Sequence, residues 1–321
     1  MINKVMFGDC RDSMKKIIDA GVEVQMCVTS PPYWNLRDYG TKGQLGQEDT
    51  PQEFVENIVD VLDLVWELLA DDGTLWLNLG DSYASGVRNR TASQAAAKSG
   101  LQGGKASQAV SLRSKSKVAG GLKIKDLAGI PWRVALALQE RGWYLRQDII
   151  WQKPNAMPES VKDRCTKSHE HIFLLSKSKS YYFDHEAIKE PAVSGSNGSQ
   201  FHTGKTGQHH QGRSSKKRRV SDSKMRNKRD VWSVPTKGYT CAHFAVFPPD
   251  LITPCIKAGS KPGDVVLDPF FGSGTTGQVA QSLGRNWIGC ELNPEYEPFQ
   301  KARTSQQGLS LTPPTEDKTD G

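Results

Sequence analysis

The chain has 321 residues, of which 36% are hydrophobic and 24% charged, and its formal net charge is +7. This size and apolar content are enough for one large folded domain or two smaller ones. No apolar run approaches the roughly 20 residues of a membrane span, and the start MINKVMFGDC lacks the apolar centre of a signal peptide, so we expect a cytoplasmic protein without a membrane partner.

The cysteines indicate neither a disulfide framework nor a zinc site, because they are scattered and form no C-x-x-C pair. They are Cys10, Cys27, Cys165, Cys241, Cys255 and Cys290. His169 and His171 share one face of a predicted strand near Cys165, but two histidines and a distant thiol are a weak metal signal. No metal is therefore expected.

The first part of the chain alternates between strand and helix patterns. In order, it predicts a strand at 4–7, a helix at 11–21, a strand at 22–30, a helix at 50–73 and a strand at 73–81. The longer helix has the clearest start signal, with Thr50 as N-cap, Pro51 at the first helical position and Glu53 completing a capping box.

The later part of the chain continues this alternation. It predicts a helix at 126–142, strands at 143–152, 169–177 and 180–184, a helix at 248–259, a strand at 264–270, a helix at 275–284 and a strand at 286–292. Such a pattern is typical of an α/β fold with a mostly parallel sheet and helices on both faces. Ligands of such folds bind beyond the carboxyl ends of the strands.

Two segments, 85–121 and 191–230, interrupt the pattern with Ser, Gly, Gln and basic residues and almost no apolar side chains. They cannot bury enough surface to offset the entropy of ordering them. Because they hold much of the positive charge, we favour arms that order on nucleic acid over passive insertions. The basic candidates for DNA contact in the second segment are Arg213, Lys216, Lys217, Arg218 and Arg219.

A rigid loop follows the strand that ends near residue 29. In the stretch VTSPPYW, Pro31 and Pro32 stop the strand and hold Ser30 and Tyr33 in a fixed relation. A hydroxyl and an aromatic ring are thereby displayed at the carboxyl end of a strand, where ligands bind.

A glycine loop joins the last predicted strand–helix pair. The stretch LDPFFGSGTTG contains a G-x-G-x-x-G, and Glu291 follows at the end of the next strand, placed to accept hydrogen bonds from both hydroxyls of a ribose. A nicotinamide-binding fold has the same pattern, but a P-loop is excluded because Gln278 replaces its lysine. The carboxylate of Asp268 beside the glycines favours a cationic ligand such as S-adenosylmethionine.

The two motifs TSPPYW and LDPFFGSGTT together resemble the amino-methylating DNA methyltransferases of the beta group, and the resemblance extends over most of the chain. It implies a Rossmann-like S-adenosylmethionine-dependent methyltransferase fold, with double-stranded DNA as substrate. It implies cofactor contacts by Asp9, Asp268, Pro269, Phe270, Gly272, Ser273, Gly274, Thr275 and Glu291, and a base pocket near Lys153 and Asn155. A cognate restriction endonuclease is a possible partner, and the oligomeric state stays open.

The resemblance divides the chain into catalytic and recognition parts. The parts are a catalytic part at 1–84, a flexible insertion at 85–121, a base-pocket part at 122–190, a target-recognition insertion at 191–230, a cofactor-binding part at 231–302 and a flexible tail at 303–321.

The resemblance also implies a mechanism for the catalytic residues Ser30, Pro31, Pro32 and Tyr33. The Ser30 hydroxyl and the Pro31 carbonyl accept hydrogen bonds from the two N–H groups of the amine on a base rotated out of the duplex, and Tyr33 stacks on that base. A serine in the first position usually accompanies cytosine N4, and its hydroxyl can also donate to cytosine N3. Adenine N6 remains the alternative, followed by a non-catalytic nucleic-acid binder and a nicotinamide-dependent oxidoreductase.

Overall fold

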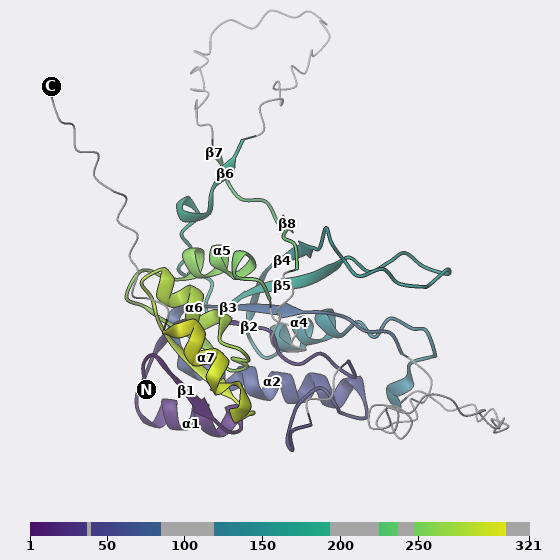
Figure 1. The fold of residues 1–321 in the computed structure, drawn as a ribbon, viewed down its shortest axis with the longest axis horizontal. Coiled ribbons are helices and arrows are strands. Elements are labelled where there is room, and N and C mark those ends of the chain that lie inside the picture. Colours follow the sequence, from purple (N-terminus) through teal and green to yellow (C-terminus); the bar gives the residue numbers. More distant parts are fainter. Residues whose placement is uncertain (37–39, 85–118, 193–224, 237–246, 306–321) are drawn as a thin grey trace, which may run out of the picture.

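The computed structural model describes residues 1–36, 40–84, 119–192, 225–236 and 247–305, and these residues build a central sheet with helices on both faces (Figure 1). The strand order is β1 (Lys4–Phe7), β10 (Asn286–Glu291), β9 (Val265–Asp268), β2 (Val24–Thr29), β3 (Leu69–Leu79), β5 (His169–Ser176), β4 (Tyr144–Gln152) and β8 (Val231–Ser233). Only β5 runs antiparallel to its neighbours in this sheet. The predicted mostly parallel α/β fold is confirmed.

Alternating side chains of the central strands feed two separate apolar cores. In β3, Leu75 and Leu77 point into one core and Trp76 into the other, as the pleat of a strand requires. The first core lies under α1 (Cys10–Asp19), α2 (Pro51–Leu68) and α4 (Ile130–Glu140), and the second under α5 (Pro249–Gly259) and α6 (Thr275–Ser282). Both faces of the sheet are therefore covered, as Figure 1 shows.

The predicted capping box at the start of α2 is present. The backbone N–H of Glu53 donates to Thr50 Oγ1, and the N–H of Thr50 donates to the Glu53 carboxylate. Both donor–acceptor distances are 3.1 Å. The helix ends at Leu68, earlier than predicted, because the chain enters β3 directly at Leu69.

The described structure corrects the predicted elements at several places. Residues 180–184, predicted as a strand, form no ladder: the N–H of Tyr182 donates to Asp72 and that of Asp184 to Ala258, on two different segments. α4 begins only at Ile130, because Gly129 adopts a left-handed φ of 71° before it. Elements absent from the prediction are α7 (Glu297–Thr304), the short strands β6 (Glu190–Pro191), β7 (Met225–Arg226) and β8, and the 3-10 turns Ala119–Gly121, Glu186–Ile188 and Pro294–Tyr296.

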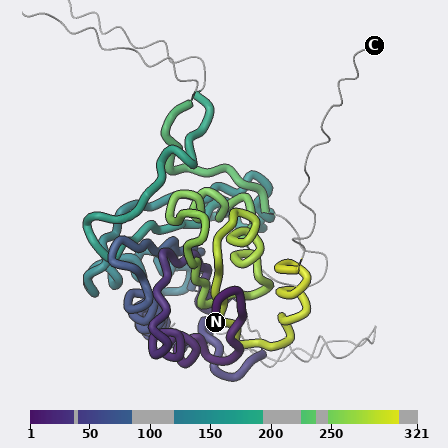
Figure 2. Tube along the Cα trace, turned by 90° about the vertical axis from the view of Figure 1, so that its left-hand side faces the viewer, coloured from purple at the N-terminus to yellow at the C-terminus, as the bar shows by residue number. Residues whose placement is uncertain are grey.

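The described residues at the two ends of the second basic segment form a small two-stranded projection. β6 (Glu190–Pro191) and β7 (Met225–Arg226) pair antiparallel, and the Glu190 carboxylate accepts from Arg226 Nε at 2.9 Å and from Arg229 Nε at 2.8 Å. Figure 2 shows this pair extending away from the sheet.

Several predictions fall outside the described residues. These are the interior of both basic segments with Arg213, Lys216, Lys217, Arg218 and Arg219, and the tail from residue 306. The boundaries proposed between the parts of the chain remain predictions. Among the helices that the structure describes, none has the length and apolarity to cross a membrane.

Candidate active site

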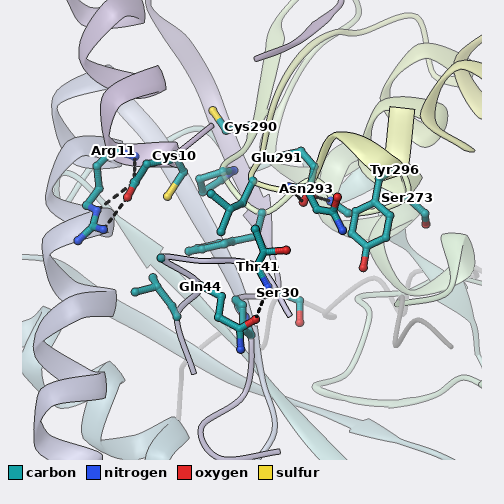
Figure 3. Close-up of a pocket in the computed structure, with 18 residues that line it drawn as sticks. Cys10, Arg11, Ser30, Thr41, Gln44, Ser273, Cys290, Glu291, Asn293 and Tyr296 are labelled. Carbon is teal, nitrogen blue, oxygen red and sulfur yellow. Dashed lines mark hydrogen bonds and ion pairs between the residues drawn. The ribbon is translucent and has the colours of Figure 1, made fainter. Parts of the chain in front are cut away.

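A pocket opens where four neighbouring parallel strands end, β1, β10, β9 and β2. Eight of its lining residues were predicted as site residues: Asp9, Ser30, Pro32, Pro269, Phe270, Gly272, Ser273 and Glu291. The other lining residues are Cys10, Arg11, Thr41, Gly43, Gln44, Leu45, Cys290, Leu292, Asn293 and Tyr296. Figure 3 shows Arg11 on one side of the pocket and Ser273 and Tyr296 on the other. The two motifs of the sequence thus meet in one cavity.

The glycine loop between β9 and α6 forms one wall of this pocket. Gly272 and Gly274 have φ values of 51° and 90°, which side-chain-bearing residues rarely adopt. A Cβ on Gly274 would also lie 3.2 Å from the Cα of Gln300 in α7. Gln300 Nε2 donates to the Gly272 carbonyl at 2.7 Å, so α7 fixes the loop from behind.

Glu291 fixes the same loop from the pocket side. Its Oε2 accepts from the N–H of Gly272 at 2.7 Å and its Oε1 from the N–H of Asn293 at 2.8 Å. Burial raises the pKa of this carboxyl group, while the two backbone donors act in the opposite direction. Each carboxylate oxygen retains a lone pair that can accept a hydrogen bond from a ligand in the pocket.

Asp268 does not line the pocket but lies beneath it. Its carboxylate accepts from Thr29 Oγ1 and Thr276 Oγ1, each at 2.6 Å, and from the N–H of Phe270 at 3.0 Å. It therefore connects β2, the glycine loop and α6, and burial raises its pKa to about 6. Gly274 and Thr275 are likewise absent from the pocket lining, so direct cofactor contacts by these three residues remain predictions.

The raised pKa of Asp268 predicts a pH-dependent cost. Because the folded-state pKa of about 6 exceeds the ordinary 3.8, the folded chain binds this proton more tightly and its stability falls as pH rises from about 4 to 6. The full cost, about 3 kcal/mol, is present above this window. Urea unfolding should show the wild type losing this much relative to Asp268→Asn between about pH 4 and pH 7. A difference that is constant with pH would contradict the assignment.

Asp9 and Arg11 form a second polar wall. Asp9 is the N-cap of α1 and accepts from the N–H of Arg11 at 2.8 Å. The Arg11 guanidinium pairs with both carboxylate oxygens, Nη2 to Oδ2 at 2.6 Å and Nε to Oδ1 at 3.0 Å. These hydrogen bonds lower the pKa of Asp9, so the carboxylate is held ionised in a fixed position. Arg11 was not among the residues predicted for the site.

The SPPY loop, residues 30–33, is the catalytic loop predicted from the sequence. It places Ser30 and Pro32 at the pocket, Pro31 in the interior and Tyr33 beside β3. The Tyr33 ring packs on the backbone of Gly80, where an added Cβ would lie 2.4 Å from Tyr33 Cε2. The Tyr33 hydroxyl donates to Glu170 Oε2 at 2.5 Å. The loop is therefore anchored to β3 and β5 at its Tyr33 end.

Of the two residues predicted near the base pocket, one lies beside this loop. Lys153 Nζ pairs with Glu170, the partner of Tyr33. Asn155 instead pairs with Thr236: its Oδ1 accepts from the N–H of Thr236 at 2.8 Å and its Nδ2 donates to the Thr236 carbonyl at 2.9 Å. Neither residue lines the pocket, and their contacts with DNA remain predictions.

In the described part of the chain, no group of three or more His, Cys, Asp or Glu residues is placed to hold a metal ion. His171 Nδ1 lies 3.0 Å from Asp148 Oδ1. Cys165 is exposed. The imidazole of His171 thus has a partner within the protein.

Comparison with known proteins identifies the family. The family model described as DNA methylase, of the N6 and N4 type, matches residues 24–301. The chain belongs to this family.

Curated relatives agree with this membership. The chain is 48% identical to the Type II methyltransferase M.SmaI of Serratia marcescens, over 94% of this chain and 90% of the relative. It is 46% identical to M.Cfr9I of Citrobacter freundii, over 90% of this chain and 83% of the relative. The protein is thus a site-specific Type II methyltransferase of the amino-methylating family, which excludes the predicted oxidoreductase alternative.

Solved structures share the fold at low sequence identity. The PvuII DNA methyltransferase, described as cytosine-N4-specific, aligns with a TM-score of 0.61 and 18% identity, over 96% of this chain and 88% of that chain. A putative DNA modification methylase from Thermus thermophilus, in complex with S-adenosyl-L-methionine, aligns with a TM-score of 0.55 and 21% identity, over 95% of this chain and 96% of that chain. The Rossmann-like methyltransferase fold and the cofactor S-adenosylmethionine are confirmed.

Proposed function

We propose that the protein transfers a methyl group from S-adenosylmethionine to the N4 amine of cytosine in a short duplex DNA site. The observation that carries this proposal is Ser30, which stands first in the SPPY loop and lines the same pocket as the glycine loop. A serine in this position usually accompanies cytosine N4 in the family that the sequence resembles. The fold shared with a cytosine-N4-specific enzyme supports the assignment.

The pocket fits the cofactor. Ser273 Oγ is buried in the pocket lining and has no hydrogen-bond partner in the described protein, so it offers a hydrogen bond to a bound ligand. Glu291 offers acceptors to the ribose hydroxyls, and Phe270 and Tyr296 offer apolar surface. When bound, S-adenosylmethionine supplies an activated methyl group on its sulfonium.

The catalytic loop prepares the amine of the base. Ser30 Oγ and the Pro31 carbonyl accept hydrogen bonds from the two N–H groups of the amine. These hydrogen bonds draw the nitrogen toward tetrahedral geometry and free its lone pair. Pro31 and Pro32 hold these acceptors in place before the base arrives, and Tyr33 supplies a stacking surface. The chain therefore positions and desolvates the reacting groups, and no covalent enzyme intermediate is needed.

DNA binding is proposed for Lys153, Asn155 and the basic cluster of Arg213, Lys216, Lys217, Arg218 and Arg219. If the four residues from Lys216 to Arg219 neutralise phosphates, replacing all of them by glutamine should flatten the salt dependence of DNA binding by about one unit of slope per lost contact. The slope is measured by fluorescence anisotropy between about 50 and 300 mM salt. A slope equal to that of the wild type would show that these four side chains do not contact DNA phosphates.

A cognate restriction endonuclease that cleaves the same site unless it is methylated is proposed as the biological partner, on the basis of the Type II relatives. Methylation-aware sequencing of DNA from a host expressing the chain tests the proposed function. We expect N4-methylcytosine at one short sequence and none in a host expressing Ser30→Ala. N6-methyladenine alone would replace the cytosine assignment by the adenine alternative, and unmodified DNA would favour a non-catalytic binder.

A further inference from the structure

A buried carboxylate lies directly behind the catalytic loop. Glu170 in β5 is only 9% exposed, and donors from three separate segments converge on it. Tyr33 Oη lies 2.5 Å and Asn78 Nδ2 3.3 Å from its Oε2, and Lys153 Nζ contacts its Oε1. The Tyr33 hydroxyl, the Asn78 amide nitrogen and the Lys153 ammonium are all donors here, so the Glu170 carboxylate is the acceptor at the centre of this cluster.

The carboxylate sets the direction of the neighbouring hydrogen bonds. Tyr33 has one hydroxyl proton, and among its described contacts are two acceptors, Glu170 Oε2 at 2.5 Å and Asn78 Oδ1 at 3.2 Å. The Tyr33 proton is donated to Glu170, because this contact is the shorter one and charge-assisted hydrogen bonds are roughly twice as strong as neutral ones. The Tyr33 oxygen is then left as an acceptor, and Ser30 Oγ lies 3.5 Å from it as the donor.

We propose that Glu170, acting through Tyr33, orients the Ser30 hydroxyl so that it accepts a hydrogen bond from the amine of the target base. The inference rests on the proposed function, which assigns that amine to Ser30. When the Ser30 proton points to Tyr33, the oxygen lone pairs are free for the pocket that Ser30 lines. Glu170 is thus a positioning residue, and a serine gains the acceptor-only behaviour of a carboxylate.

The same geometry has a consequence for base choice. A Ser30 hydroxyl that donates to Tyr33 has no second proton for cytosine N3. The preference for cytosine therefore does not arise from a Ser30–N3 hydrogen bond.

Single-turnover methylation by two variants, each in two backgrounds, tests the inference. Tyr33→Phe removes the hydroxyl and keeps the ring, and Glu170→Gln removes the charge and keeps the shape. In the wild-type background each should lower the rate constant about tenfold, the equivalent of one hydrogen bond. In the Ser30→Ala background each should cost less than about twofold, because no hydroxyl remains to be oriented.

Control measurements separate positioning from loss of structure. Cofactor affinity should not change in Tyr33→Phe. Its melting temperature should fall by a few degrees because the bond to Glu170 is lost, so the rates are measured well below the melting temperatures of both proteins. Asp148→Asn, which removes a carboxylate paired with His171 on the neighbouring strand, should leave the rate unchanged. Should Glu170→Gln fail to fold, Tyr33→Phe alone decides.

Three results would be decisive against the inference. Equal losses in both backgrounds, or no loss in the wild-type background, would overturn the role of Glu170 and leave the proposed function intact. A Ser30→Ala enzyme with full activity would instead overturn the role of Ser30 in the proposed function, and the inference with it.

Discussion

Ser30→Ala is expected to lower the rate of methyl transfer at least about 100-fold, the scale seen when one preorganised polar contact to a reacting group is removed. The amine would keep the Pro31 carbonyl but lose the acceptor that lines the pocket. Cofactor affinity should stay within about twofold of the wild type, because Glu291 and Ser273 are untouched. Single-turnover kinetics and calorimetry measure the two quantities separately.

Ser282→Ala is the matched control for this change. Ser282 ends α6, and its hydroxyl donates to the Val279 carbonyl at 2.8 Å, away from the pocket lining. Its rate should equal that of the wild type. If Ser30→Ala lost cofactor affinity and rate in parallel, Ser30 would belong to the cofactor site rather than to the base.

Glu291→Ala should weaken S-adenosylmethionine binding at least about 100-fold, a loss of roughly 3 kcal/mol. The variant loses the acceptors for the ribose, and it also leaves the N–H groups of Gly272 and Asn293 without their carboxylate partner. Glu291→Gln keeps one acceptor oxygen and should lose less. Isothermal titration calorimetry measures the affinities.

Glu295→Ala provides the control for charge near this pocket. Glu295 is exposed and follows Asn293 closely along the chain, so its removal takes away the same charge without touching the glycine loop. Unchanged affinity in Glu291→Ala would refute the ribose assignment, whereas equal losses in both variants would point to long-range electrostatics.

The carboxyl ends of the strands could be predicted from the sequence because each ends in a strong local signal. Pro31 and Pro32 stop β2, the glycines follow β9, and Glu291 closes β10. Parallel strands bring such ends to one edge of the sheet, so the pocket follows from the pattern. The orientation of Asp268 could not be predicted in this way, because its carboxylate turns inward, where two threonine hydroxyls and a backbone amide donate to it.

Three other features of the structure could not be read from the spacing of apolar residues in the sequence. α7 presents Gln300 and Arg303 to the interior, so its buried face is polar and the apolar spacing that identifies a helix is absent. Glu170 is surrounded by partners 17 to 137 residues away in the chain, and only tertiary structure brings them together. Residues 180–184 have strand-like composition, but no neighbouring strand pairs with them in the described structure.

The most direct test is the identity of the methylated nucleoside. Purified protein, DNA and S-adenosylmethionine with an isotope-labelled methyl group are incubated together, and the DNA is digested to nucleosides and analysed by mass spectrometry. We predict that the label appears in N4-methylcytosine and is lost with Ser30→Ala. Label in N6-methyladenine alone would contradict the cytosine assignment, and label on a ring carbon would contradict methylation of an exocyclic amine altogether.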